Sequence, residues 1–371
     1  YLGHRDREKA CEASSQLMVV TAVCALVFTV LSLVARKPLL SLLFGRIDAD
    51  VMDAALTYLT VSAISFPFLA SFNSSSALFR AMNDSRTPTM VSLGMNVMNL
   101  VGNSILIFGM KWGVAGAAIS TLLSRVMAAV VMFILSLNKH RQLYVRLDQM
   151  TCFQPTLVGQ ILYIGIPSGI ENGIFELGRI VVVSMISTFG TVQIAANAVA
   201  NNLDGVGCIP GQAIGLAMIT VVGRCVGAGD NEQTVFYTRK LLLWAYITMG
   251  LSNGAILLFL RQLVGIYALS GETMELAITL VTIHAGCAII FWPLSFVLPN
   301  ALRAANDVKF TMVVSILSMA CWRLGFSYLL CVRMGWGAVG VWVAMVIDWT
   351  CRVTCFVLRF RSGAWKTKYQ A

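Results

Sequence analysis

The chain has 371 residues, of which 58% are hydrophobic and 12% are charged, and its formal net charge is +10. The charged share is about half that of an ordinary soluble domain, which excludes a protein surrounded by water on all sides. Its basic residues stand singly between apolar runs instead of forming one patch, which argues against a nucleic-acid-binding protein. Long unbroken apolar runs also do not fit the short alternating strands of a β-barrel. We therefore expect an all-α polytopic membrane protein.

Ten apolar runs are long enough to cross a bilayer as helices, which requires about 20 residues each. Charged residues or Gly- and Pro-rich breaks separate the runs. The expected spans are residues 14–35, 54–79, 88–110, 113–137, 156–188, 191–222, 237–260, 273–300, 308–332 and 336–358.

Lys and Arg are distributed unequally between the two sides of these spans. The side that includes both ends of the chain carries 17 of them, and the other side carries six, which are Arg36, Lys37, Arg46, Lys111, Arg261 and Arg333. Cytoplasmic loops of membrane proteins carry the excess of basic residues. We expect both termini of this chain to be cytoplasmic, in a plasma (inner) membrane.

Three motifs occur twice in the same order, and the two copies are 223 or 224 residues apart. The matched positions are Gly3, Asp6 and Glu8 with Gly227, Asp230 and Glu232; Arg80, Ala81, Asn83 and Asp84 with Arg303, Ala304, Asn306 and Asp307; and Trp112, Gly113 and Gly116 with Trp336, Gly337 and Gly340. A constant spacing of this kind predicts two homologous halves.

The repeat also predicts what precedes this chain in its parent protein. Two spans precede Gly227, but nothing precedes Gly3, and the chain begins with Tyr1. By symmetry we expect a parent with two six-helix lobes whose first two helices, about 70 residues, are absent here. Residues 1–138 would form an N-terminal lobe of four helices, 139–155 a cytoplasmic linker, and 156–371 a C-terminal lobe of six helices. Because six is even, both lobes enter the membrane in the same direction.

Ionisable side chains inside spans cost about 2.5–3.5 kcal/mol each, so each one needs a partner or a function. Those within the expected spans are Arg125, Glu171, Glu176, Arg179, Asp204, His284, Arg323, Asp348 and Arg352. The spacing predicts local ion pairs between Glu176 and Arg179 and between Asp348 and Arg352. For these four residues, a local ion pair and a functional role remain open alternatives.

Glu171 has no basic neighbour three or four residues away on its own helix. It needs a partner from another helix, a coupling cation, or a proton. Arg323 and Asp348 are candidate partners. We therefore interpret Glu171 as a functional carboxylate.

Two stripes of polar residues follow one helix face each. Asn96, Asn99 and Asn103 form the first stripe, and Asn197, Asn201 and Asp204 form the second. Lipid cannot hydrogen-bond these groups, so both stripes are expected to face other helices or a wet cavity. The alternative role is to hold helices together, at about 0.6 kcal/mol for each side chain.

The sequence gives little support to an enzyme. It contains three His and no HExxH, Walker or GxSxG motif. His284 is expected to be a packed helix residue. The ten Cys lie mostly inside apolar runs, without a CxxC pair or a nearby His ligand, and are expected to be small hydrophobic side chains. We expect no catalytic residue, no metal site and no cofactor.

Several motifs together resemble the multidrug and toxic compound extrusion (MATE) family of transporters along the whole chain. They are YLGHRDREKA, FRAMNDSRTP, NVMNLVGNSILIFG, WGVAGAAIST, IPSGIENGIFELGR, VGAGDNEQ, LRAAND and GVWVAMVIDW. The resemblance implies twelve helices in two lobes around a central cleft that opens alternately to each side of the membrane. It also implies export of organic, often cationic, compounds driven by inward Na⁺ or H⁺.

The resemblance further suggests cation-binding positions. Asn99, Asn103 and Thr121 look like the fifth- and sixth-helix positions of the family's first-lobe site, and Asn103 stands where some members have Asp. The first-helix Asp of that site would lie in the missing segment. Glu171 or Glu176 is similar to the seventh-helix acid of members with a second-lobe site.

These observations favour a monomeric secondary antiporter that exports organic, cationic drugs or toxic compounds in exchange for Na⁺ or H⁺ by alternating access. Its partners would be these small substrates and membrane lipid. A close alternative is a flippase of the same superfamily for lipid-linked precursors. Such a flippase needs several basic residues facing its cleft, and few basic residues lie in the spans. A membrane-embedded receptor or enzyme is a distant alternative, and the two-fold repeat argues against it.

Overall fold

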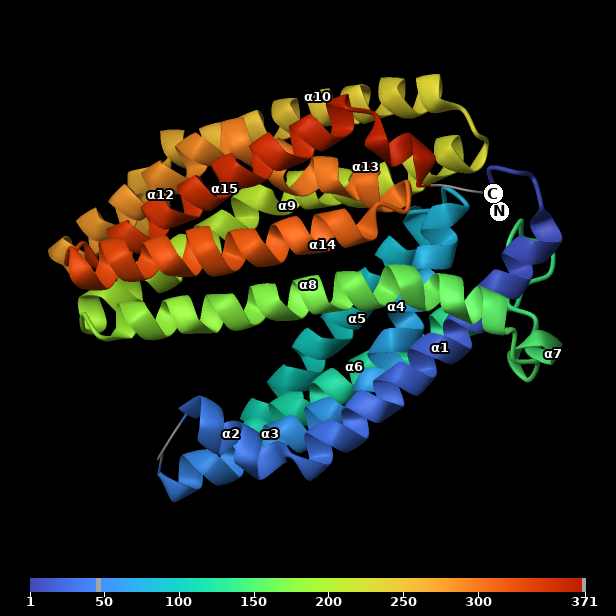
Figure 1. Cartoon of the computed structure of the whole chain (residues 1–371). Coiled ribbons are helices and arrows are strands. Elements are labelled where there is room, and N and C mark those ends of the chain that lie inside the picture. The colour runs from blue at the N-terminus through green and yellow to red at the C-terminus, as the bar shows by residue number, and fades with distance from the viewer. Residues whose placement is uncertain (45–47, 369–371) are drawn as a thin grey trace. The chain divides into compact units, whose positions relative to one another are not determined.

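The computed structural model describes residues 1–44 and 48–368, and all regular elements within these ranges are helical (Figure 1). Eight of the described helices are long and apolar enough to cross a membrane, or up to nine if a pair bent by 42° counts as one span. This confirms the all-α membrane fold that the composition predicts, while the count of ten spans stays a prediction. Arg46, one of the six basic residues assigned to the external side, lies outside the described residues.

The chain divides into two compact units, Tyr1–Ile161 and Leu162–Ala371. In the first unit, α6 packs against three other long helices, α3, α4 and α5, and α1 packs against α4. The elements of this unit are α1 (Arg7–Val34), α2 (Arg36–Phe44), α3 (Ala49–Ile64), α4 (Phe66–Ala81), α5 (Arg86–Asn103), the π-helical segment η1 (Ser104–Gly109), α6 (Gly113–Ser136) and α7 (Leu147–Met150).

In the second unit, α9 is the central helix, because α10, α12 and α13 all pack against it. Helix α8 (Pro155–Ser187) begins in the first unit and lies mostly in the second. The further elements are α9 (Thr191–Gly227), α10 (Asn231–Leu258), α11 (Leu260–Gly265), α12 (Gly271–Trp292), η2 (Pro293–Val297), α13 (Leu298–Ala304), α14 (Val308–Leu317), η3 (Ser318–Gly325), η4 (Tyr328–Arg333), α15 (Gly337–Arg361) and η5 (Ala364–Thr367).

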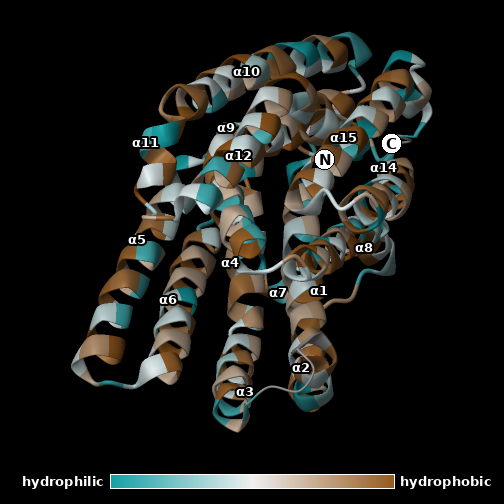
Figure 2. Cartoon of the chain, turned by 90° about the vertical axis from the view of Figure 1, so that its left-hand side faces the viewer, coloured by the Kyte–Doolittle hydropathy of each residue, from teal (hydrophilic) through white to brown (hydrophobic). Residues whose placement is uncertain are grey.

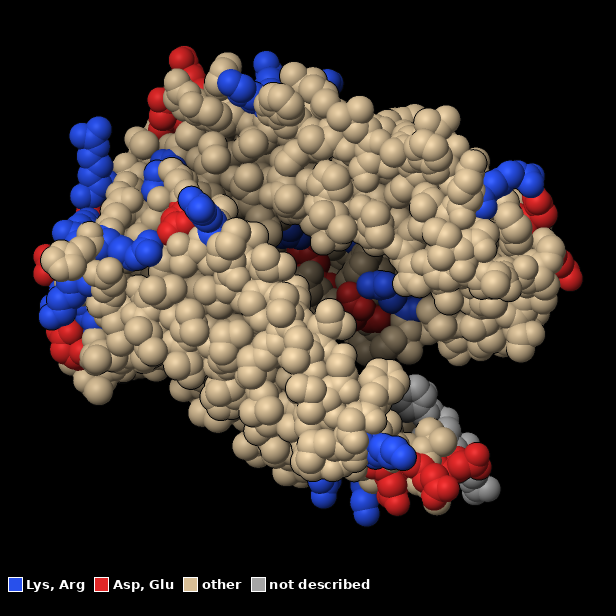
Figure 3. Space-filling model, turned by 180° about the vertical axis from the view of Figure 1, so that it is seen from behind, with Lys and Arg blue, Asp and Glu red and all other residues tan. Residues whose placement is uncertain are grey.

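The surface of the long helices is apolar. Leu251 is 71% exposed and Phe108 is 78% exposed, and hydrophobic residues predominate along the long helices in Figure 2. On the face seen in Figure 3, broad areas of the surface carry no charged side chain. Such a surface is unfavourable in water but matches the hydrocarbon of a bilayer.

The repeated motifs adopt matching backbone conformations in the two units. Asn83 and Asn306 both have φ 63°, in the left-handed region that Asn tolerates better than most residues. In the loops that follow α4 and α13, the amide of Asp84 bonds the carbonyl of Phe79, and that of Asp307 bonds the carbonyl of Leu302, both at 2.9 Å. The shared motif therefore specifies the same tight helix ending twice.

The same motif provides one ion pair in each unit. The Asp84 carboxylate accepts from Arg141 at 2.9 Å, and the Asp307 carboxylate accepts two bonds from Arg359, at 2.7 and 3.1 Å. Each arginine also lies 4.6 Å from the centre of an aromatic ring, Arg141 over Phe79 and Arg359 over Phe310. These pairs tie the loop to the chain just after α6 in the first unit and to the last turn of α15 in the second.

Gly116 and Gly340, which also match in the repeat, allow close helix contacts. A Cβ atom at Gly116 would lie 3.1 Å from the backbone of Leu106, and one at Gly340 would lie 2.7 Å from the backbone nitrogen of Cys331. Both neighbours are backbone atoms that cannot move aside cheaply. Gly340 is therefore required for α15 to pack this closely against η4, and Gly116 favours the equally close contact of α6 with η1.

We predict that Asp307→Asn lowers the free energy of unfolding by about 2 kcal/mol, because it leaves the partly buried guanidinium of Arg359 without its carboxylate. The side chain of Asp307 is only 4% exposed, so water cannot replace the lost pair well. Unfolding of the purified protein in mixed micelles at neutral pH measures this change.

Asp84→Asn is the matched control. Asp84 and Arg141 are 27% and 30% exposed, so their pair should contribute about 1 kcal/mol or less. Hydrogen bonds from Thr87, and then Arg141, lower the pKa of Asp84. The charged form therefore stabilises the fold above about pH 4, and this contribution is lost as the pH falls through the lowered pKa. Equal losses for the two variants at neutral pH would contradict the role assigned to burial.

Candidate functional site

A cavity of about 660 Å³ lies within the second unit. Its wall comes from α8, α9, α12, η2, α13, η3 and α15, and it includes six of the ten candidate site residues that the sequence singled out. Those lining the cavity are Glu171, Glu176, Asn197, Asn201, Asp204 and Arg323, together with His284. The cavity therefore brings together polar residues from helices far apart in the sequence.

Glu171 is 8% exposed, and its Oε1 atom accepts hydrogen bonds from Arg303 at 2.6 Å and Ser315 at 2.5 Å. Arg303 also donates to Asn300 at 2.6 Å. The prediction that Glu171 needs a partner from another helix is confirmed. The candidate partners Arg323 and Asp348 were wrong, because the repeated LRAAND motif brings Arg303 to Glu171 instead.

Asp348 and Arg352 form the expected pair on α15, with 3.3 Å between Oδ1 and Nε. Asp348 is fully buried and also accepts a hydrogen bond from Ser318. The guanidinium of Arg352 lies 5.6 and 5.3 Å from the ring centres of Phe175 and Phe296. The pair thus joins α15 to α8, η2 and η3 by contacts that sequence spacing alone does not reveal.

Three further charged side chains, Glu176, Arg179 and Arg323, lie along the cavity wall. Glu176 and Arg179 are 3.3 Å apart, which confirms the predicted local pair, and both side chains are more than half exposed. Arg323 lies near enough to Asp348 and Asp204 to interact electrostatically with both. Its Nε atom has no hydrogen-bond partner within the part of the chain that the structure describes.

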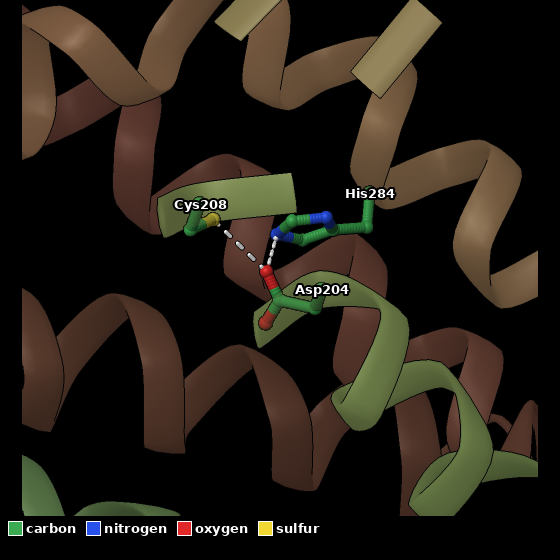
Figure 4. Close-up of side chains that lie close together, drawn as sticks. All are labelled: Asp204, Cys208 and His284. Atoms are coloured by element: carbon green, nitrogen blue, oxygen red, sulfur yellow. Dashed lines mark hydrogen bonds and ion pairs between the residues drawn. The ribbon is translucent and has the colours of Figure 1, made fainter. Parts of the chain in front are cut away.

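Asp204, Cys208 and His284 meet where α9 packs against α12 (Figure 4). Oδ1 of Asp204 lies 2.6 Å from Nε2 of His284 and 3.1 Å from Sγ of Cys208. The folded chain therefore brings a His close to Cys208, and the prediction that no Cys has a nearby His was wrong. His284 is 76 residues from Cys208 and 80 from Asp204, which hides this neighbourhood from sequence reasoning, and only the single in-span His was a signal for it.

The polar stripe on α9 continues this cluster. Asn197 accepts a hydrogen bond from Trp342 Nε1 at 2.9 Å, and Asn201 donates to the backbone of Asn197 at 2.9 Å. The Trp342 ring lies edge-on to His284, with 5.6 Å between ring centres. The stripe therefore faces other helices and the cavity, as expected.

The candidate residues of the first unit form a separate group. Asn99 donates to Thr121 at 3.1 Å, and Asn103 donates to the side chain of Asn99 at 3.2 Å. Oδ1 of Asn103 has no hydrogen-bond partner among the described residues. In the same unit, Arg125 donates to Ser65 at 2.6 Å. The structure thus places Asn99, Asn103 and Thr121 side by side with one free amide oxygen.

Comparison with known proteins identifies the family. The sequence profile of MatE matches residues 1–105 and 167–329. The chain belongs to the MatE family. The match covers both units, and the family's members are transporters, so the chain is a multi-pass membrane transporter.

Two bacterial relatives are each 28% identical to this chain. The "Uncharacterized transporter YisQ" of Bacillus subtilis aligns with 100% of this chain and 82% of its own length. The "Probable multidrug resistance protein NorM" of Thermotoga maritima aligns with 92% of this chain and 75% of its own length.

Solved structures share the fold at lower identity. A crystal structure of MATE in the bent conformation has a TM-score of 0.86 at 20% identity, covering 98% of this chain and 81% of that one. A MOP superfamily transporter from Pyrococcus furiosus has a TM-score of 0.87 at 19% identity, with the same coverage. At these identities the likeness concerns the fold alone.

The Asp348–Arg352 pair gives a test of how the cavity wall is held. We predict that Arg352→Met destabilises the protein by about 3–5 kcal/mol, because it leaves the fully buried Asp348 carboxylate without its cation. The double variant Asp348→Asn with Arg352→Met should regain most of this loss. Unfolding in mixed micelles measures the coupling, and a double variant no more stable than the single one would show that the pair is not the cause.

Proposed function

We propose that this transporter is a secondary antiporter that exports organic compounds, cationic ones among them, in exchange for Na⁺ or H⁺. Its membership of the MatE family supports the proposal, as does the name of its relative from Thermotoga maritima. The observation that carries it is Glu171, a carboxylate buried in the cavity of a membrane-embedded unit. Such groups mark ion and proton pathways in transporters.

Contacts around Glu171 suggest how an ion is coupled to transport. In this structure the guanidinium of Arg303 balances the Glu171 charge, and Ser315 completes the contact. A coupling cation or proton that reaches Glu171 competes with Arg303 for the same oxygen. Binding then frees Arg303. The ion therefore interacts more strongly with an arrangement in which Arg303 has left Glu171 than with the one in which the two are paired. That difference is what coupling to a conformational change requires.

The residues of the cavity wall support the proposal that the substrates are organic compounds. Phe175, Trp292, Phe296, Trp342 and Trp349 line it, and aromatic faces attract organic cations. Carboxylates of Glu171, Glu176 and Asp204 lie in the same wall, the first two paired with Arg303 and Arg179. A cavity of 660 Å³ is also within the size range of sites for small molecules.

A second cation position is proposed in the first unit, at Asn99, Asn103 and Thr121. Their oxygen atoms suit Na⁺, which prefers hard oxygen ligands. Oδ1 of Asn103 is available for this role, since no described residue donates to it. This position contains neutral amides where the second unit has charged residues, so we assign the main coupling step to Glu171.

The flippase alternative is less favoured because the basic residues of the cavity are largely neutralised. Arg179, Arg303 and Arg352 line the wall, and each forms an ion pair with a carboxylate. A pyrophosphate head group needs several basic side chains that are free to bind it. Transfer of lipid-linked oligosaccharide in vesicles, measured beside dye efflux, distinguishes the two functions.

We also propose that the protein lies in the plasma (inner) membrane as a monomer, with both ends of this chain on the cytoplasmic side. The excess of Lys and Arg on that side supports the orientation.

Transport under separate ion gradients identifies the coupling ion. We expect vesicles that contain the protein to transport ethidium or a fluoroquinolone faster when a Na⁺ or a pH gradient is imposed, with one of the two gradients effective. Fluorescence recorded under each gradient separately measures this. Protein-free vesicles are the control, and transport that responds to neither gradient would contradict the antiporter.

The role of Glu171 is tested by neutralising its side chain. We expect Glu171→Gln to reduce gradient-driven efflux by roughly tenfold or more, because glutamine neither exchanges a proton nor neutralises a cation. The amount of protein inserted in the membrane should stay unchanged.

Glu176→Gln is the matched control, since Glu176 lines the same cavity but is exposed and paired only with its helix neighbour. It should retain efflux. Loss of efflux in Glu176→Gln alone would transfer the role to Glu176, and undiminished efflux in Glu171→Gln would remove Glu171 from the mechanism.

A further inference from the structure

The cluster of Asp204, Cys208 and His284 offers three different metal-ligating atoms at one point of the cavity wall. Asp204 and Cys208 lie one turn apart on α9, and His284 comes from α12 (Figure 4). The carboxylate oxygen, the sulfur and the imidazole nitrogen all lie within 4.8 Å of one another. A four-coordinate ion with ligand bonds of about 2.0–2.3 Å separates its ligand atoms by less than this limit.

The side chain of His284 is buried without a full set of hydrogen-bond partners. Its side chain is 1% exposed, and Nδ1 has no hydrogen-bond partner among the described residues. Nε2 lies 2.6 Å from Asp204 Oδ1, which is the distance of a hydrogen bond or ion pair in which a proton lies between the two atoms. Sγ of Cys208 borders the same point, so the three ligand atoms converge where that proton lies. A buried imidazole nitrogen without a partner is costly, and the His284 ring is therefore only half satisfied.

We propose that Asp204, Cys208 and His284 bind a divalent transition metal of borderline softness, with Zn²⁺ as the representative ion. Carboxylate, thiolate and imidazole are the three ligand types that Zn²⁺ takes in proteins. Na⁺, Mg²⁺ and Ca²⁺ prefer oxygen ligands and are poorly matched by a sulfur and a nitrogen. The site is therefore distinct in chemistry from the Na⁺ or H⁺ position proposed at Glu171, and it does not depend on that proposal.

The charges of this set favour a divalent ion in the low dielectric of a membrane protein. One carboxylate and one thiolate balance the two charges of the metal, so the loaded site is neutral. Arg323 interacts electrostatically with Asp204, and a metal ion must compete with this positive charge. We therefore expect an affinity below that of structural zinc sites with four protein ligands.

The cavity gives the ion its entry path and its open coordination position. All three residues line the cavity, and the side chain of Asp204 is 27% exposed. Three protein ligands leave a fourth position for water or for a donor atom of a transported compound. A bound metal would also join α9 to α12 at a point where they form one wall of the cavity.

Cobalt is the probe that tests this site, because a bond between Co²⁺ and a thiolate gives a charge-transfer absorption that Zn²⁺ lacks. The full chain, purified in detergent with its cysteines reduced, is titrated with Co²⁺, and the bound ion is then displaced with Zn²⁺. We expect one Co²⁺ for each chain, a charge-transfer band, intense visible absorption from four-coordinate Co²⁺, and loss of both on addition of Zn²⁺.

Variants identify the ligands. Cys208→Ser should abolish the charge-transfer band, and His284→Gln should weaken binding by roughly 10- to 100-fold while all ten cysteines remain. Cys225→Ser, the same change on the same helix outside the cluster, should bind Co²⁺ like the unmodified protein.

Absence of the charge-transfer band in the unmodified protein would overturn the proposal, and this result needs no variant to fold. Equal binding by the unmodified protein and His284→Gln would overturn it as well, because the cobalt would then be bound by other cysteines.

Discussion

The ion pair between Glu171 and Arg303 is the interaction on which the cavity of the second unit depends. Lipid offers a buried carboxylate neither a hydrogen bond nor a positive charge. Helix α8 must therefore pack where α13 and α14 bring Arg303 and Ser315 to the Glu171 carboxylate. The other charged groups obey the same constraint. Asp348 is neutralised by Arg352, and Asp204 lies against His284. The polar side chains thereby fix how the helices of this unit are arranged around one cavity.

The two copies of the repeat share their helix ends and the ion pairs beside them, but their interior polar residues differ. Asn83 and Asn306 end helices with the same left-handed residue, and the following aspartates pair with arginines in the same way. In the interior of the first unit, the amide of Asn99 bonds the hydroxyl of Thr121, whereas the interior of the second unit contains clusters of charged residues. Turn geometry tolerates little change, because few residues adopt positive φ, whereas interior side chains can change whenever a partner changes with them.

The cavity holds two clusters with different chemistry. Around Glu171 the partners are a guanidinium and a hydroxyl, which suit the exchange of a small hard cation or a proton. Around Asp204 the partners are a thiol and an imidazole, which suit a softer ion. Both clusters line the same space as the aromatic rings of Phe296 and Trp342. A transported compound in the cavity would therefore lie close to both.

The sequence by itself determined the membrane fold, the local pairs and the repeated turns. These features depend on apolar length, on a spacing of three or four residues, or on backbone conformations that few residues adopt. Only the tertiary structure decided which distant residues meet. Arg303 lies 132 residues from Glu171, and His284 lies 80 residues from Asp204, so helical periodicity says nothing about either contact. Partner choice across helices depends on how whole helices pack, and that is a property of the assembled unit.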